Sequence, residues 1–176
     1  MSRRRSAALA PARSDRAGHR GGEARQPSVR LELQRRVRGW SPSARELTRW
    51  ASAALGRSAG GRELGVCMVA AAESARLNAR FRGRDRPTNV LSFPAAALPT
   101  PRPRPPLGEL VICPRVLRAE ARAQQKTLRA HWAHLVVHGA LHLAGYDHEQ
   151  AAQARRMERR EVAVLRRLGF ANPYRS

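Results

Sequence analysis

The sequence predicts an α+β domain in which a small mixed sheet packs with helices around a central apolar helix. Short apolar runs typical of strands, such as 64–70 and 107–113, alternate with longer segments of helical periodicity. The most apolar helical segment, 127–143, is followed by an amphipathic one, as expected of a helix at the centre of a domain. A chain of 176 residues is long enough for one such core.

The first part of the chain is unlike the rest. Residues 1–27 combine arginine with Ala, Ser, Gly and Pro and show no apolar periodicity. We therefore expect a disordered basic arm over 1–27 and a folded domain over 28–176. The arm could bind phosphates without sequence preference, be a transit peptide, or result from a wrongly assigned start codon.

The first predicted elements of the domain are a strand and a helix. Apolar and polar residues alternate over 29–37, which indicates a half-buried strand. Ser41 as N-cap and Pro42 in the first turn predict a helix over 42–56. Its expected buried residues are Leu47, Trp50, Ala54 and Leu55.

The middle of the chain predicts two strands separated by a helix. The strands are expected over 64–70 and 88–93, and the helix over 73–81, ended by Gly83. Six prolines in the thirteen residues 94–106 exclude a helix or a central strand, so this segment is predicted to be a surface loop.

The last third of the chain predicts one strand and three helices. The strand covers 107–113, and Pro114 begins a helix that runs to about residue 125. Thr127 is the expected N-cap of the apolar helix. The last helix, 149–168, is amphipathic, and its expected inward-facing residues are Ala154, Met157, Val162 and Leu165.

The net charge of the chain is strongly positive. Lys plus Arg total 34 against 13 Asp plus Glu, which gives +21 at neutral pH. Such a field attracts nucleic acid or an anionic membrane, and RNA is the first partner to consider. Because Lys126 is the only lysine, the arginine content could instead reflect the base composition of the genome.

The cysteines and the hydropathy indicate a cytoplasmic protein. Cys67 and Cys113 lie far apart in apolar runs, and we expect both to be reduced core residues. No apolar stretch has the length of a membrane span, and no apolar signal-peptide segment follows the first arginines, so no membrane association is expected.

Three histidines near the end of the apolar helix predict a metal site. His138 and His142 are four residues apart, so their rings project from one face of a helix. Gly145 can take the left-handed conformation that ends a helix, which would return His148 towards the same point. Three imidazoles suit Zn²⁺ and leave its fourth position open, as in a catalytic site, so the sequence predicts a metal-dependent hydrolase.

Other interpretations of these histidines compete with this one. His134 with His138 is a rival pair on the same helix, although we expect His131 and His134 to pack around the ligands. The spacing is also that of the metzincin proteases, in which a glutamate general base follows the first histidine. Here that residue is Gly139, which makes a metallopeptidase the second hypothesis.

Asp147 is the only carboxylate within the motif. Its position beside His148 suits a role in orienting that ligand better than a role as the general base.

Three segments together form a pattern that is more specific than the histidine spacing alone. The first begins with Leu77-Asn78 and continues through Phe81-Arg82-Gly83-Arg84-Asp85-Arg86-Pro87-Thr88-Asn89-Val90-Leu91-Ser92-Phe93-Pro94. The second is Leu107-Gly108-Glu109-Leu110-Val111-Ile112-Cys113, and the third runs from His131 to His148. Together they resemble the bacterial YbeY-type endoribonucleases, or rRNA maturation factors, and the resemblance covers most of the chain from about Leu64 to Tyr174.

The resemblance implies a function and assigns residues to it. The three zinc ligands of the family correspond to His138, His142 and His148, and an arginine important for activity corresponds to Arg82. The implied activity is zinc-dependent cleavage of single-stranded RNA, in maturation of the 3′ end of the 16S rRNA and in ribosome quality control, with the small ribosomal subunit as partner. A third hypothesis is a ribosome-assembly factor without catalysis, in which zinc is structural.

Overall fold

The computed structural model describes residues 28–95, 105–146 and 150–175 of the chain. The predicted arm over 1–27 and most of the proline-rich loop therefore lie outside the described residues. The elements follow in the order β1 (Arg30–Arg35), α1 (Ala44–Leu55), a short 3-10 helix η1 (Gly56–Ala59), β2 (Glu63–Met68), α2 (Ala71–Arg82), β3 (Val90–Pro94), β4 (Gly108–Ile112), α3 (Pro114–Ala123), α4 (Leu128–Leu143) and α5 (Ala151–Arg167).

The strands form one mixed sheet, as the sequence predicted. Its order is β1-β2-β4-β3, with β1, β2 and β4 parallel and β3 antiparallel to β4. The crossover from β1 to β2 runs through α1, and the crossover from β2 to β4 includes α2 and β3. The resulting mixed α/β architecture confirms the predicted combination of a small sheet with helices.

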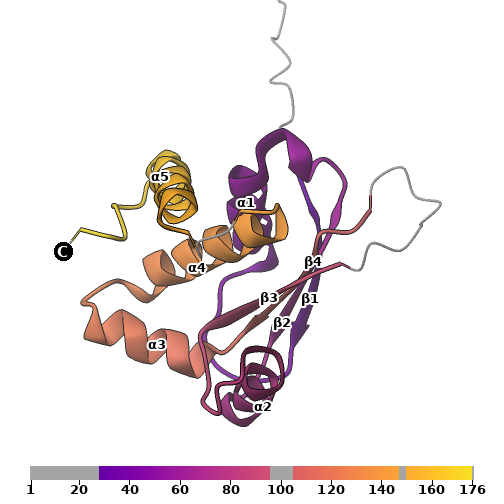
Figure 1. Ribbon diagram of the computed structural model, residues 1–176, viewed down its shortest axis with the longest axis vertical. Coiled ribbons are helices and arrows are strands. Elements are labelled where there is room, and N and C mark those ends of the chain that lie inside the picture. Colours follow the sequence, from indigo (N-terminus) through magenta and orange to yellow (C-terminus); the bar gives the residue numbers. More distant parts are fainter. Residues whose placement is uncertain (1–27, 96–104, 147–149, 176) are drawn as a thin grey trace, which may run out of the picture.

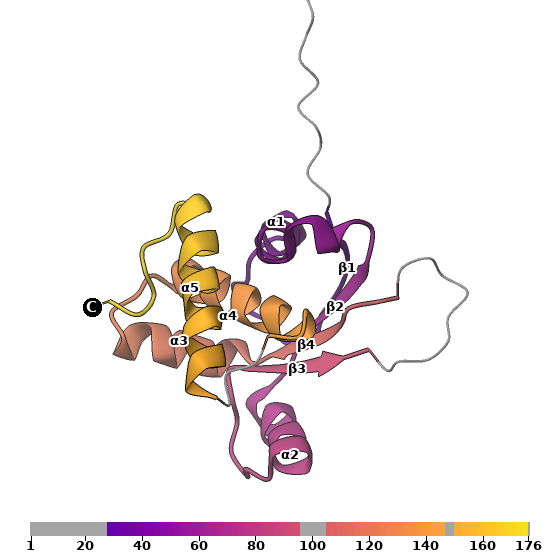
Figure 2. The ribbon, with the colours of Figure 1, turned by 45° about the horizontal axis from the view of Figure 1, so that its top comes forward.

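Helices cover both faces of the sheet (Figures 1 and 2). α1 and α4 lie on one face and α2 lies on the other. Helix α4 contacts β3 and β4 as well as α1, α3 and α5, and ten of its sixteen residues are buried. The main core lies between this helix and the sheet, with Trp50, Trp132 and Leu110 fully buried in it.

The start of α1 differs from the prediction. The helix begins at Ala44, and its N-cap is Ser43 rather than Ser41. The Ser43 hydroxyl accepts a hydrogen bond from the Glu46 N–H, and the Glu46 carboxylate accepts one from the Ser43 N–H. This reciprocal capping box satisfies two N–H groups that would otherwise lack partners, which favours the later serine. The four residues predicted to be buried in α1 are all buried.

The buried face of α5 also differs from the prediction. Met157 and Leu165 are buried as expected, but Val162 is only half-buried and Val164 takes its place in the core. Ala154 is half-buried and lines a cleft. The fourth buried residue of this helix is a carboxylate, Glu161.

The two cysteines are buried and free, which confirms the prediction. Desolvation raises the pKa of the Cys67 thiol, so the neutral thiol is favoured. Within the described ranges, no helix combines the length and the apolar character needed to cross a bilayer.

Candidate metal centre

His138 and His142 project together from one face of α4. Their ring centroids are 4.6 Å apart and the ring planes are inclined by 80°. Both side chains line a cleft of about 790 Å³. The predicted pair at i and i+4 is therefore assembled on the accessible side of an otherwise buried helix.

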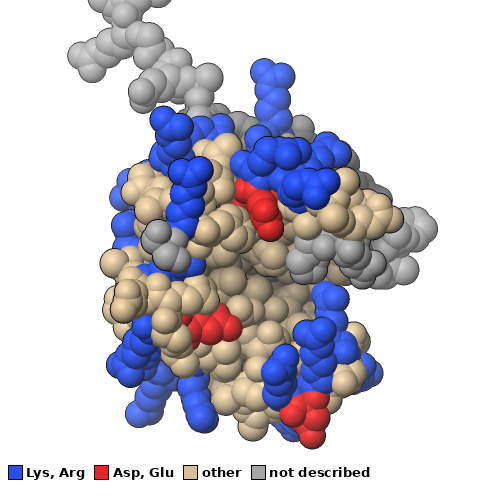
Figure 3. Space-filling view, turned by 60° about the vertical axis from the view of Figure 1, so that its left-hand side comes forward, with Lys and Arg blue, Asp and Glu red and all other residues tan. Residues whose placement is uncertain are grey.

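The cleft is bounded by α4 and α5 on one side and by α2, β3 and the segment between them on the other. Arg82, the last residue of α2, and Arg84 both line it. Gly83 separates them and takes a left-handed conformation with φ of 65°, which ends the helix. Figure 3 shows this side of the molecule, on which basic side chains gather around a largely uncharged hollow.

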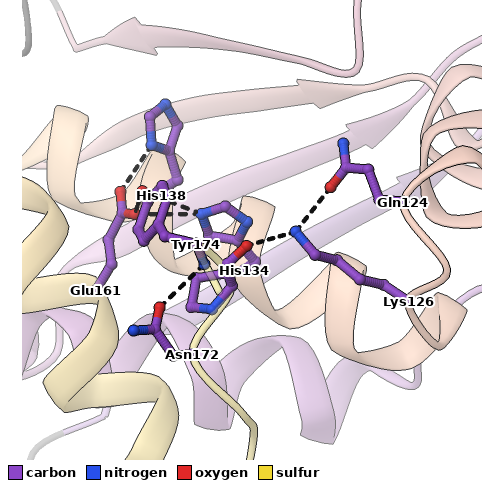
Figure 4. Close-up of polar contacts among 8 residues, drawn as sticks. Gln124, Lys126, His134, His138, Glu161, Asn172 and Tyr174 are labelled. Carbon is purple, nitrogen blue, oxygen red and sulfur yellow. Dashed lines mark hydrogen bonds and ion pairs between the residues drawn. The ribbon is translucent and has the colours of Figure 1, made fainter. Parts of the chain in front are cut away.

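The two nitrogens of the His138 ring have different roles. Nδ1 lies 2.7 Å from Glu161 Oε1 (Figure 4). Because a carboxylate can only accept, Nδ1 carries the proton and donates it to this hydrogen bond. Nε2 is then the nitrogen that could bind a metal ion, as is usual when a carboxylate supports a histidine ligand.

Glu161 accepts hydrogen bonds at both oxygens. Its side chain is 1% exposed, and Oε2 lies 3.2 Å from His134 Nε2 and also accepts from the Tyr174 hydroxyl. Burial alone would raise the pKa of Glu161, but hydrogen bonds from His134, His138 and Tyr174 lower it to about 2. The carboxylate is therefore ionised at neutral pH and can hold the His138 tautomer.

His131 belongs to a neighbouring polar group. Its Nε2 lies 2.9 Å from Glu120 Oε2, and the same carboxylate accepts from Asn89 Nδ2 at 2.9 Å. Asn89 lines the cleft beside β3. His131 and His134 thus contact carboxylates next to His138 and His142, in the surrounding positions that the sequence predicted.

The predicted turn after α4 is present, whereas the third predicted ligand lies outside the described residues. Gly145 has a φ of 87°, and the Tyr146 N–H donates to the Leu141 carbonyl, which closes the end of the helix. His148 and Asp147 are outside the described residues. Within the described ranges there is no group of three His, Cys, Asp or Glu side chains placed to hold a metal ion.

Gly139 faces the sheet rather than the cleft. A Cβ atom built there would lie 2.7 Å from Leu110 Cδ2 and 3.2 Å from Ser92 Oγ. The position therefore has no room for a glutamate, and a side chain there would point towards the core. This arrangement argues against the general base that the metallopeptidase hypothesis requires.

Glu161 is the functional candidate that sequence reasoning missed. It lies four residues after Met157 and four before Leu165, on the apolar stripe of a helix otherwise rich in exposed arginine. A lone carboxylate on the buried face of an amphipathic helix is costly unless it is paired. The position of Glu161 on this stripe could have indicated a functional role from the sequence. Its hydrogen-bond partners, however, come from α4 and from the segment after α5.

Two comparisons with known proteins identify the same family. The family model described as "Endoribonuclease YbeY" matches residues 32–169. A protein named "Endoribonuclease YbeY" from Alkalilimnicola ehrlichii is 52% identical over 154 residues, which cover 85% of this chain and 93% of the relative. A solution structure from Thermotoga maritima is 25% identical, with a TM-score of 0.49, and the match covers 84% of this chain and all of that one.

Proposed function

Because the chain belongs to the YbeY endoribonuclease family, we propose that it is a single-strand-specific, zinc-dependent endoribonuclease acting in rRNA maturation. Its expected substrate is the 3′ end of the 16S rRNA in the small ribosomal subunit, and it would also serve ribosome quality control in the cytoplasm. The observation that carries the proposal is the cleft that is lined by both the histidine pair of α4 and Arg82.

The histidine pair of α4 and the carboxylate that supports His138 favour a zinc ion. His138, His142 and His148 would hold it, and the hydrogen bond from His138 Nδ1 to Glu161 would make Nε2 the ligating nitrogen. When bound, zinc supplies a Lewis acid that polarises a phosphoryl oxygen and lowers the pKa of a water molecule. Imidazole ligands also accept Ni²⁺ and Cu²⁺, so the metal found in the cell depends on availability as well as on affinity.

Arg82 and Arg84 supply the positive charge that RNA requires. Phosphodiester cleavage increases the negative charge on the phosphate oxygens, and a guanidinium offers a planar fork of donors to them. Arg82 is exposed at the end of α2, so its side chain can reach a bound phosphate. We assign it the role of stabilising this charge, and Arg84 that of attracting the RNA backbone.

The direct test combines metal analysis with RNA cleavage. Full-length protein is stripped of metal, reloaded with zinc, and assayed on single-stranded and duplex RNA of the same sequence. Cleavage should depend on zinc, favour the single strand, and be lost in His138→Ala and His142→Ala. Cleavage that persists in metal-free protein or in His138→Ala would contradict the proposal. A folded protein that binds RNA without cleaving it would favour the assembly-factor hypothesis.

Arg82 has a matched control on the same helix. Arg80 lies two residues earlier, stacks over the Phe81 ring and does not line the cleft. Arg82→Ala should lower kcat/KM by about 100-fold, as expected when a donor to the transition state is removed. Arg80→Ala carries the same loss of charge and should change kcat/KM little. Equal effects of the two variants would reduce Arg82 to a general electrostatic role.

The ends of the products identify the nucleophile. Attack by the RNA 2′-hydroxyl leaves a 2′,3′-cyclic phosphate, whereas attack by water does not. Mass spectrometry of the fragments distinguishes the two, and a substrate with a 2′-deoxy sugar at the cleaved position provides the control.

A further inference from the structure

The segment that follows α5 returns to the cleft. After Leu168 the chain turns at the end of α5, and Tyr174, at the far end of the segment that follows, lines the cleft. The Tyr174 ring packs edge-on against His134, with ring centroids 5.4 Å apart. The last described residues therefore form part of the wall around the histidines.

Lys126 fixes this segment in place. Its ammonium donates to the Pro173 carbonyl and, over 2.7 Å, to Gln124 Oε1 (Figure 4). Within the segment, the Tyr174 N–H donates to Asn172 Oδ1 over 3.0 Å. The only lysine of the chain thus connects the start of α4 to the residue that precedes Tyr174.

The Tyr174 hydroxyl reaches the buried carboxylate of Glu161. It donates to Oε2, while Oε1 of the same carboxylate accepts from His138 Nδ1. Tyr174 is 47% exposed, whereas the Glu161 side chain is 1% exposed, so the phenol brings a donor from the surface to the interior. Three groups in series, Tyr174, Glu161 and His138, therefore connect the segment after α5 to a proposed metal ligand.

On the basis of the proposed function, we infer that Tyr174 is a positioning residue of the metal centre. Its hydroxyl orients Glu161, which holds His138 with the proton on Nδ1, so that Nε2 would be the nitrogen that binds the metal. Lys126 supports this role by fixing the segment that carries Tyr174. Tyr174 acts through Glu161 and does not contact the reacting atoms.

The tautomer of His138 is the most direct measurement. In full-length, metal-free protein, imidazole ¹⁵N chemical shifts report which ring nitrogen is protonated. The wild type should show His138 protonated at Nδ1, and Tyr174→Phe should shift part of the population to the other tautomer. Phe keeps the aromatic ring against His134 and removes only the hydroxyl, so the variant should fold, and thermal denaturation verifies it.

Zinc affinity provides the second measurement, by competition with a chelating dye. Tyr174→Phe should bind zinc about 10-fold more weakly, at the low end of the range for residues that support a metal ligand. Lys126→Met should weaken binding less, in the same direction. Arg122→Met is the matched control, because it removes a positive charge from the nearby exposed end of α3, and it should leave the affinity unchanged.

The outcomes separate this inference from the proposed function. A wild type that does not bind zinc contradicts the proposed function, and the tautomer measurement, which needs no zinc, still tests the role of Tyr174. Normal zinc binding by the wild type with an unchanged tautomer and affinity in Tyr174→Phe would overturn the inference. If Tyr174→Phe increased only the KM for RNA, the inference would be overturned too, because Tyr174 would then contact the substrate.

Discussion

Replacing Gly139 with alanine tests how closely α4 packs against the sheet. The glycine lies directly after His138, and a methyl group there would meet Leu110 Cδ2 at 2.7 Å and Ser92 Oγ at 3.2 Å. Leu110 is fully buried between the sheet and the helix. The atoms around the new methyl can therefore move only if neighbouring core side chains move with them.

Two opposing effects determine the free energy of unfolding of Gly139→Ala. Alanine is favoured over glycine in a helix by about 1 kcal/mol. Inserting a methyl group into a close-packed core costs about 1–3 kcal/mol. Taking about 2 kcal/mol for the second effect, because one contact is far below the van der Waals distance, we expect a net destabilisation of about 1 kcal/mol. The shift of α4 should also lower zinc affinity, since His138 moves with the helix.

Urea denaturation followed by circular dichroism measures this difference. The control is Ala163→Gly, at an exposed position in the middle of α5, which measures the effect of helix propensity without a packing change. Gly139→Ala could instead be stabilised by about as much as Ala163→Gly is destabilised, about 1 kcal/mol. Position 139 would then have room for a side chain, which would contradict the close packing against Leu110 and Ser92.

Three further predictions concern other parts of the structure. Glu161→Gln keeps the shape of the side chain but removes its charge. It should weaken zinc binding about 10- to 100-fold in the dye competition assay. Unchanged affinity would exclude Glu161 as the support of His138. Burial alone would raise the pKa of Glu120, but hydrogen bonds from His131 and Asn89 outweigh it and lower the pKa. This ionised carboxylate should therefore stabilise the fold at pH values above its ordinary pKa. The difference in the free energy of unfolding between wild type and Glu120→Gln should shrink as the pH falls from about 6 to about 3. A difference that does not change with pH would contradict the lowered pKa of Glu120. Ser43→Ala removes the capping box of α1 and should lower the free energy of unfolding by about 1 kcal/mol in urea denaturation, while no change would return the cap to Ser41.

The sequence predicted those features that depend on neighbouring residues. Thr127 caps α4, Pro114 begins α3 and Gly145 takes a positive φ after α4, because each of these effects acts within one turn of a helix. The four strands were predicted within a few residues of their observed ends for the same reason. Ser41 was the predicted cap and Ser43 is the observed one, because serine caps well at either position and only the pairing with Glu46 favours the later residue.

The features that were missed or taken only from resemblance depend on distant parts of the chain. Arg82 and His138 are 56 positions apart and line one cleft only because α2 and α4 lie on either side of β3. Glu161 obtains its partners from α4 and from Tyr174, which no local periodicity indicates. The sequence can show that a carboxylate on an apolar stripe needs a partner, but the fold determines which partner it finds.

Chemical labelling of the two buried thiols would report how often the sheet opens. Cys67 lies on β2 and Cys113 directly follows β4, so an alkylating reagent can reach either one only when the neighbouring strands and helices separate. The rate of labelling would then measure the population of open molecules rather than the reactivity of a surface group. A metal ion that binds only the closed form should slow this labelling in proportion to its occupancy. Thiol labelling could therefore count bound zinc without any RNA substrate.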